Sequence, residues 1–263
     1  MRNAKELLGT HDFVMITLDT LRFDVAQGCY ERRELPSLAS HLPRSGWERR
    51  HSPANFTYAA HHAFFAGFLP TPESPGPHPR LFALAFQGSE TTVERTLVFD
   101  ASSLPEGFRA AGYHTACIGG VGFFNLETPL GRVLPNLFEE KHWRPDFGVT
   151  NPISTELQIR CATRILAEQA NRVFLFLNVS ALHQPNKMYV PGAVEDSPTT
   201  QAAALRYVDS QLPPLFDALK RRGKALILVF GDHGTAYGED GYVGHRLNHP
   251  VVGDVPYAEF DLN

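Results

Sequence analysis

Four short stretches of the chain, far apart in sequence, carry residues that could together bind a metal ion. Two stretches hold an aspartate directly after a run of apolar residues, and the other two hold a threonine and a histidine in polar segments. The residues are Asp19, Thr57, His183 and the pair Asp232 and His233. Carboxylate and imidazole groups suit a divalent transition metal, and metal coordination activates a hydroxyl as a nucleophile. The set therefore predicts metal-assisted chemistry at Thr57.

The pair Asp232 and His233 is the most specific local signal. It lies between Gly231 and Gly234, at the end of the apolar run 226–230. Glycines permit tight backbone turns around a ligand, and a carboxylate beside an imidazole suits a transition metal. A hydrogen-bonded aspartate and histidine at a turn is the structural alternative. The pattern favours metal binding over this alternative.

Asp19 and Thr57 each have a plainer explanation when taken alone. A buried carboxylate is costly unless it is paired or bound to metal, but Asp19 could instead cap the next helix and pair with Arg22. Thr57 falls near the start of a predicted helix, where the dipole favours an alkoxide or a bound anion, but it could also be a simple N-cap. Their combination with the other candidates is what favours function.

The remaining histidines are less specific. His183 follows a predicted strand, so it is better placed than His245 to bind a substrate oxygen, protonate a leaving group or complete a second metal site. For His245 and His249, a position in a solvent-facing loop explains the sequence equally well. His61 and His62 could equally be surface residues of the helix that begins near Thr57.

These residues need a scaffold that brings distant segments together. Apolar runs alternate with stretches of helical periodicity, which is typical of a mostly parallel sheet covered by helices on both faces. Strands are predicted at 12–18, 113–118, 173–178 and 225–230, and helices at 104–111, 154–170 and 200–221. Ligands of open α/β sheets bind at the carboxyl ends of strands, where both aspartates fall. The chemistry should therefore lie along one edge of an α/β sheet.

Three long segments rich in proline and glycine, 69–80, 119–152 and 184–199, exceed the usual length of a connection. They are predicted to build the site rather than to link domains. With 263 residues and 43% hydrophobic content, the chain can bury a large core. It is therefore expected to form one domain, residues 1–263.

The composition argues against several function classes. The net charge of -4 and the lack of a basic stripe exclude nucleic acid as an expected partner. No apolar run is long enough to span a membrane, and the N-terminus is charged where a signal peptide would be apolar, so a cytoplasmic location is expected. Three cysteines without paired spacing, Cys29, Cys117 and Cys161, are expected to be ordinary buried thiols.

Motifs along nearly the whole chain resemble the alkaline phosphatase superfamily, specifically its sulfatase-like and phosphodiesterase branches. The run 16–24 is similar to the sulfatase opening motif, whose aspartate binds metal, and 104–119 resembles the helix-to-strand segment of the family. The segment 174–185 resembles the one in which a substrate-contacting histidine precedes a proline, and 231–245 resembles the metal-binding block. The resemblance implies an alkaline-phosphatase-like core, expected here without the C-terminal subdomain that most sulfatases carry.

The nucleophile motif distinguishes between the branches. Sulfatases place a cysteine or serine in a Cys-x-Pro-Ser-Arg pattern that is oxidised to formylglycine, whereas this chain has Thr57-Tyr-Ala-Ala-His61. Gly67 and Pro70 fall where the family motif ends in glycine and proline, and nucleotide pyrophosphatase/phosphodiesterases have threonine and histidine at the places of Thr57 and His61. The later Asp-His pair also resembles the phosphate-ester branch and the phosphoglycerol and phosphoethanolamine transferases. A formylglycine sulfatase is therefore disfavoured.

The resemblance implies a role for each candidate residue. Asp19, Thr57, Asp232 and His233 would bind a divalent ion, zinc or manganese, and Thr57 would attack phosphorus. His183 would protonate the leaving oxygen or bind a non-bridging oxygen.

A second metal or substrate contact would come from further residues in the same segments. His61 would assist catalysis or support a second ion, and His245, Asn178 and Arg22 are the other candidates. The Asp-x-x-x-His pair that completes the second zinc site of phosphodiesterases is not visible, since Asn178 stands in its region. One or two ions are therefore expected.

The expected function is a metal-dependent hydrolase or phosphotransferase acting on a phosphate mono- or diester. Its substrate would be a small-molecule or peptide-linked anionic ester. Two alternatives stay open: a sulfate-ester or phosphonate hydrolase, and a non-catalytic metal-binding partner protein in a modification pathway. No membrane partner is expected.

Overall fold

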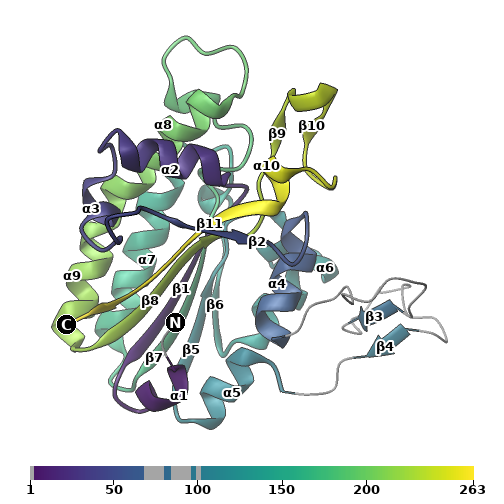
Figure 1. Ribbon diagram of the computed structural model, residues 1–263. Helices are drawn as coiled ribbons and strands as arrows, with labels where there is room; N and C mark the ends of the chain where they lie inside the picture. The colour runs from purple at the N-terminus through teal and green to yellow at the C-terminus, as the bar shows by residue number, and fades with distance from the viewer. Residues whose placement is uncertain (1–2, 68–79, 84–95, 99–101) are drawn as a thin grey trace.

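A seven-stranded sheet forms the centre of the protein (Figure 1). The computed structural model describes residues 3–67, 80–83, 96–98 and 102–263. In spatial order the strands are β2 (Glu48–His51), β11 (Asp254–Leu262), β8 (Ala225–Gly231), β1 (Asp12–Leu18), β7 (Val173–Val179), β5 (His114–Ile118) and β6 (Glu140–His142). The strands from β8 to β6 are parallel to one another. The predicted α/β class with a mostly parallel sheet is confirmed.

The four predicted strands are confirmed to within one residue at each end. They correspond to β1, β5, β7 and β8, which are neighbours in the sheet. Both β1 and β7 are buried along their whole length. A strand covered on both faces must be apolar on both, which is why these four could be recognised as continuous apolar runs.

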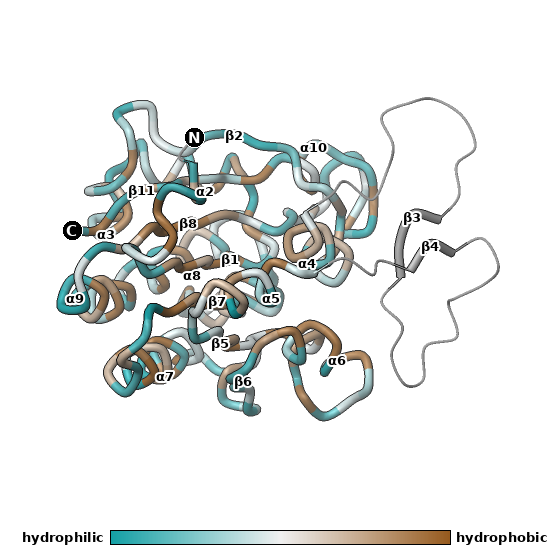
Figure 2. Tube along the Cα trace, turned by 90° about the horizontal axis from the view of Figure 1, so that it is seen from below, coloured by the Kyte–Doolittle hydropathy of each residue, from teal (hydrophilic) through white to brown (hydrophobic). Residues whose placement is uncertain are grey.

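Helices cover both faces of this sheet, and their apolar sides face it (Figure 2). Alternation along β1 sends Val14 and Ile16 to one face and Phe13 and Met15 to the other. The first face is covered by α2 (Phe23–Glu31), α7 (Ser154–Glu168), α8 (Pro198–Gln211) and α9 (Pro213–Arg222), and the second by α4 (Thr57–Ala66) and α5 (Leu104–Ala110).

Short elements complete the described chain. The helices are α1 (Ala4–Leu7), α3 (Pro36–Ala39), α6 (Pro129–Val133) and α10 (Pro250–Gly253), and two small sheets pair β3 (Arg80–Ala83) with β4 (Thr96–Val98) and β9 (Ala236–Tyr237) with β10 (Val243–Gly244). The β9 and β10 hairpin lies beyond the end of β8, as Figure 1 shows.

Three strands of the central sheet were not predicted: β2, β11 and the edge strand β6. β11 lies antiparallel between β8 and β2, and β2 forms the sheet edge. Pro256 and acidic residues interrupt the apolar pattern of β11, and β2 has the wholly polar sequence Glu-Arg-Arg-His. Period-based prediction fails for strands near an edge, because one face or side of them meets solvent.

Some predicted boundaries were wrong. The helix predicted at 200–221 is two helices, α8 and α9, which meet at Leu212 because two prolines at the start of α9 cannot donate backbone hydrogen bonds. The predicted loop 119–152 contains α6, β6 and several 3-10 turns. Residues 69–79 of the first predicted loop lie outside the described residues.

Two expectations from composition concern membrane-spanning helices and cysteines. None of its helices has the length and apolar content needed to cross a membrane. Cys29 and Cys117 are buried free thiols, as expected, whereas Cys161 is half-buried.

Candidate metal centre

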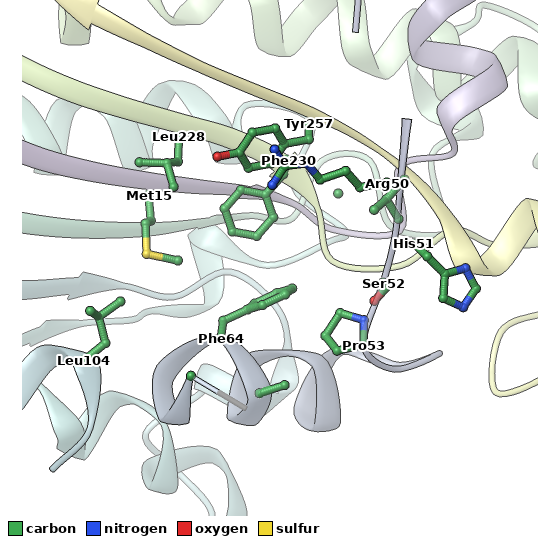
Figure 3. A pocket seen from close by; sticks show the side chains of 14 residues that line it. Met15, Arg50, His51, Ser52, Pro53, Phe64, Leu104, Leu228, Phe230 and Tyr257 are labelled. Atoms are coloured by element: carbon green, nitrogen blue, oxygen red, sulfur yellow. The ribbon is translucent and has the colours of Figure 1, made fainter. Parts of the chain in front are cut away.

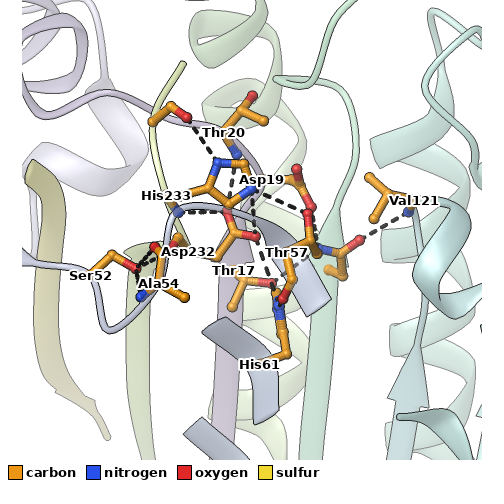
Figure 4. Close-up of polar contacts among 12 residues, drawn as sticks. Thr17, Asp19, Thr20, Ser52, Ala54, Thr57, His61, Val121, Asp232 and His233 are labelled. Atoms are coloured by element: carbon orange, nitrogen blue, oxygen red, sulfur yellow. Dashed lines mark hydrogen bonds and ion pairs between the residues drawn. The ribbon is translucent and has the colours of Figure 1, made fainter. Parts of the chain in front are cut away.

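Asp19 and Asp232 lie side by side at the carboxyl end of the sheet (Figure 4). Asp19 directly follows β1 and Asp232 directly follows β8, and the two strands pair in parallel with Leu18 opposite Gly231. Both carboxylates are fully buried. Parallel pairing of two apolar strands is thus what brings these distant residues together.

Thr57 is the first residue of α4, and its hydroxyl faces this pair of strand ends. Its Oγ1 lies 3.2 Å from His233 Nε2. Phe56 is the N-cap and makes no side-chain cap bond, so the alternative of Thr57 as an N-cap is not what the structure shows. The Ser52 hydroxyl donates to the backbone carbonyl of Asp232, which fastens the segment before α4 to the end of β8.

Two carboxylate oxygens of the cluster, Asp19 Oδ1 and Asp232 Oδ2, have no hydrogen-bond partner among the described residues. The other oxygen of each is held in place. Asp19 Oδ2 accepts from Asn178 Nδ2 at 3.0 Å, and Asp232 Oδ1 accepts from the backbone N–H groups of Thr20 and His233 at 3.0 Å each. A buried carboxylate oxygen without a partner is costly, and a bound cation would remove that cost.

His233 is oriented to offer Nε2 as a ligand. Its Nδ1 lies 2.8 Å from the carbonyl oxygen of Gly234, which can only accept, so Nδ1 carries the hydrogen and Nε2 keeps its lone pair. Asp19, Asp232 and His233 each offer a ligand atom within 4.8 Å of the others. With Thr57 Oγ1 they provide four oxygen and nitrogen donors, which fit a divalent metal ion such as zinc.

The electrostatics of the cluster agree with a cation site. Burial, together with the neighbouring Asp232, raises the pKa of Asp19 to about 6, and burial raises the pKa of Asp232 to about 7. Burial also lowers the pKa of His233. Each group is thereby pushed toward its neutral form, and a bound cation would restore the ionised carboxylates.

His61 lies behind Thr57, one helical turn along α4. Its Nδ1 donates to the carbonyl of Thr57 at 2.7 Å, and its Nε2 accepts from the hydroxyl of Thr17 at 3.1 Å. The side chain is fully buried, and burial lowers its pKa to about 3. A neutral imidazole with both nitrogens engaged positions the start of α4, so this geometry does not support the catalytic role predicted for His61.

Asn178 supports Asp19 from the neighbouring strand. It pairs with Thr17 in the β1 and β7 register, and alternation places both on the face covered by α4. Its amide nitrogen donates to Asp19 Oδ2 and to Thr17 Oγ1 at 3.0 and 3.3 Å, and its Oδ1 accepts from the N–H of Val121 at 3.0 Å. Asn178 therefore orients a ligand, and its oxygen is already in use.

His183 and His245 lie near His233. The His245 ring is 4.6 Å from the His233 ring and 5.9 Å from that of His183, measured between centroids. His183 Nδ1 donates to the carbonyl of Gln184 at 2.5 Å, which leaves the lone pair of Nε2 free to act. Burial, then the two neighbouring histidines, lowers the pKa of His245 to about 3. Both predicted histidines thus lie beside the cluster, but they are not among the residues whose ligand atoms could share one ion.

Arg22 does not face the cluster. Its Nε and Nη2 donate to the Asp24 carboxylate at 2.8 and 2.6 Å, and its Nη1 pairs with Glu239. The pairing of Arg22 with Asp19, considered from the sequence, is not formed. The predicted metal or substrate contact of Arg22 is not supported either, because two carboxylates already occupy its guanidinium.

Three contributors were missed from the sequence. Thr17 links His61 to Asn178, Ser52 holds the segment before α4, and Thr20 donates its N–H to Asp232 from a left-handed backbone conformation with φ of 62°. Only Thr17 gave a signal, as a polar residue inside an otherwise apolar strand.

A separate cavity of about 520 Å³ lies beside the site (Figure 3). It is lined mainly by apolar side chains and contains none of the predicted metal ligands. Met15, Phe64, Leu228, Phe230 and Tyr257 form most of its apolar wall. The cavity lies between α4 and β8, on one face of the sheet, and it is not part of the metal cluster.

Comparison with known proteins assigns the family. The sequence model of the sulfatase family matches residues 11–252, which include every residue of the metal cluster. The chain belongs to the sulfatase family. Membership supports an enzyme that acts on sulfate or phosphate esters. A comparison with curated protein sequences gave no match.

Solved structures agree on the fold of this sulfatase-family chain. They include the lipoteichoic acid synthase LtaP from Listeria monocytogenes, with a TM-score of 0.62 and 14% identity over 95% of this chain and 65% of that one. The C-terminal periplasmic domain of EcEptC from Escherichia coli, in complex with Zn, gives 0.60 and 13% over 96% and 73%. A Vibrio parahaemolyticus protein of the alkaline phosphatase superfamily gives 0.59 and 16% over 94% and 60%. The predicted superfamily is confirmed.

Proposed function

We propose that this protein is a metal-dependent phosphate-ester hydrolase or phosphotransferase with Thr57 as its nucleophile. The observation that carries the proposal is the convergence of two buried, unpartnered carboxylate oxygens, His233 Nε2 and the Thr57 hydroxyl. Such a set has no evident structural use, because unpartnered buried carboxylates cost stability. The substrate would be a small-molecule or peptide-linked anionic ester.

Asp19, Asp232, His233 and Thr57 would hold one divalent ion, zinc or manganese. When bound, the ion would supply positive charge that lowers the pKa of a hydroxyl and stabilises charge developing on phosphoryl oxygens. The amide oxygen of Asn178 is occupied by the Val121 N–H, which favours one ion over two.

Other residues would position the nucleophile, shield it from water and transfer a proton. His61 holds the carbonyl of Thr57 and so fixes the first turn of α4. The residue Thr57 is 2% exposed, which limits access of bulk water to the nucleophile. His183 is half-buried with its Nδ1 engaged by the Gln184 carbonyl, and its Nε2 would take a proton and return it to the leaving oxygen.

The two alternative functions considered from the sequence predict different outcomes. A sulfate-ester or phosphonate hydrolase would use the same cluster but prefer other anions. A non-catalytic partner protein in a modification pathway would bind metal without turning over any ester. The cytoplasmic location likewise stays a prediction, and the EcEptC domain is described as periplasmic.

Turnover of aryl phosphates, phosphodiesters and sulfate esters, measured with added zinc or manganese, tests the proposal. Thr57→Ala should lower kcat by at least about a thousandfold, because it removes the nucleophile. The same variant should keep its metal, measured by elemental analysis. Wild-type protein that binds metal but converts none of these esters would favour the non-catalytic alternative.

A further inference from the structure

We propose that Arg246 is a specificity-determining residue that binds a second negative charge on the substrate. This charge would belong to the leaving part of the ester, as a carboxylate or a further phosphate. The inference rests on the proposed function, since it names the substrate class of the same site.

Arg246 lies at the outer side of the nucleophile. Its backbone N–H donates to the carbonyl of Asn55 at 2.9 Å, and its guanidinium carbon lies 5.6 Å from the centroid of the Phe56 ring. Phe56 directly precedes Thr57 in the chain. The Arg246 side chain is exposed, whereas Thr57 is buried. A substrate that reaches Thr57 therefore leaves its outer part near Arg246.

The charge of Arg246 is not compensated by the protein. No carboxylate lies within ion-pair distance of it in the described part of the chain, whereas Arg22, also near the site, is paired with two carboxylates. Arg246 directly follows His245, whose ring lies 4.6 Å from that of His233, so its charge lies near the cluster. A divalent ion would balance Asp19 and Asp232, so the site would then carry the unbalanced charge of Arg246.

The geometry of Arg246 suits recognition of a planar or tetrahedral anion. The guanidinium lies within cation–π range of the Phe56 ring, and its planar fork of N–H groups can donate two parallel hydrogen bonds to one anion. The ring of Phe123 lies 6.4 Å from that of Phe56, which adds an aromatic wall for an apolar or aryl part of the leaving group. Arg246 also has φ of 70°, a left-handed conformation that is uncommon for a residue other than glycine.

A matched pair of substrates tests the inference: 4-carboxyphenyl phosphate and its neutral isostere 4-carbamoylphenyl phosphate. Wild-type protein should prefer the carboxylate by about fivefold to tenfold in kcat/KM, mainly through KM, since a charge-assisted bidentate contact is worth about that factor. Arg246→Ala should reduce the ratio to about one. Equal preference in wild type and Arg246→Ala, or no preference in wild type, would overturn the inference.

Three further variants separate the guanidinium from other effects. Arg246→Lys keeps the charge without the fork and should keep part of the preference. Arg246→Gly adopts the left-handed backbone without strain and should lose the preference as Arg246→Ala does. Arg144→Ala removes another exposed arginine near a phenylalanine, 4.8 Å from the Phe147 ring and paired with Asp146, and should keep the full preference.

Calorimetric binding of the matching carboxy and carbamoyl phenylphosphonates to metal-loaded protein gives a readout without turnover. The carboxy compound should bind more tightly to wild type and equally to Arg246→Ala. If no ester is turned over but this difference is found, the hydrolase proposal fails while the recognition of charge by Arg246 stands. If esters are turned over and the difference is absent, Arg246 has no such role.

Discussion

At the scale of single residues, two aspartates at opposite ends of β1 show how burial can serve binding or stability. Asp19 at the carboxyl end is buried with one unpartnered oxygen, and its pKa is raised to about 6 by burial and by Asp232. Asp12 at the amino end is also buried, but Arg222 Nε and the N–H of Val173 each donate to it at 2.8 Å. Only the first arrangement leaves capacity for a ligand.

Asp232→Asn should stabilise the metal-free protein and abolish metal binding. Burial raises the pKa of Asp232 to about 7, so at pH 8 the folded protein holds an unfavourable buried charge that asparagine would remove. The free energy of unfolding at pH 8 should rise by about 2 kcal/mol. Denaturant unfolding and elemental analysis of the variant are the measurements.

Asp12→Asn is the matched control for this prediction. It removes a charge that is paired with Arg222, so it should destabilise the protein by about 3 kcal/mol in the same unfolding experiment. If both variants changed the free energy of unfolding in the same direction, the carboxyl end of the sheet would not be organised for a cation.

At the scale of elements, the end of β8 depends on its contact with α10. The N–H of Gly234 donates to the carbonyl of Val252 at 2.8 Å, and a Cβ at Gly234 would lie 1.9 Å from the carbonyl oxygen of Val251. This close approach fixes the direction in which the chain leaves the sheet after His233. It is one reason why glycine follows the metal-binding pair.

Gly234→Ala should therefore displace the turn that carries His233. We expect a loss of about 2 kcal/mol or more in the free energy of unfolding and a weaker affinity for zinc, because backbone atoms cannot move away from the new Cβ without shifting α10. Unfolding by denaturant and metal titration measure the two effects.

Gly122→Ala is its control, since a Cβ at Gly122 meets no atom within 4 Å. This change should alter the free energy of unfolding by less than about 0.5 kcal/mol and leave metal affinity unchanged. Similar losses in both variants would mean that the close contact at Gly234 does not matter.

The features that could be predicted from the sequence are those set by neighbouring residues, and the features that depend on distant segments could not. The apolar runs of β1 and β8 identified the strands and the residues that follow them, so Asp19 and Asp232 could be placed at one sheet edge. The roles of His61 and Arg22 could not, because they depend on partners supplied by other segments, such as Thr17 and Glu239. Periodicity reports burial, and hydrogen-bond partners are set by tertiary structure.

At the scale of the whole molecule, the pH dependence of stability combines buried carboxylates with raised pKa values and buried histidines with lowered ones. Asp19 and Asp232 have raised pKa values of about 6 and about 7, so their contribution to the metal-free protein is present below about pH 4 and is lost as the pH rises through 6 to 7. Burial lowers the pKa of His61 and of His245 to about 3, so their contribution is present above about pH 6.5 and is lost as the pH falls. The two contributions nearly cancel between about pH 4 and 7, so the stability of the metal-free protein should change little across this range and fall below about pH 4.

A bound cation should change this balance, because it favours the ionised carboxylates that the metal-free protein disfavours. Protons compete with the metal at acidic pH, so stabilisation by zinc should grow as the pH rises. At one fixed zinc concentration, about a hundred times the Kd at pH 8, we expect Tm at pH 8 to rise by about 5–10 °C, and at pH 5.5 to rise by less than about 2 °C. Thermal unfolding of metal-saturated and chelator-treated protein at both pH values measures the difference. An equal shift at both pH values, or a shift that survives in the double variant Asp19→Asn and Asp232→Asn, would show that zinc stabilises the fold from another site.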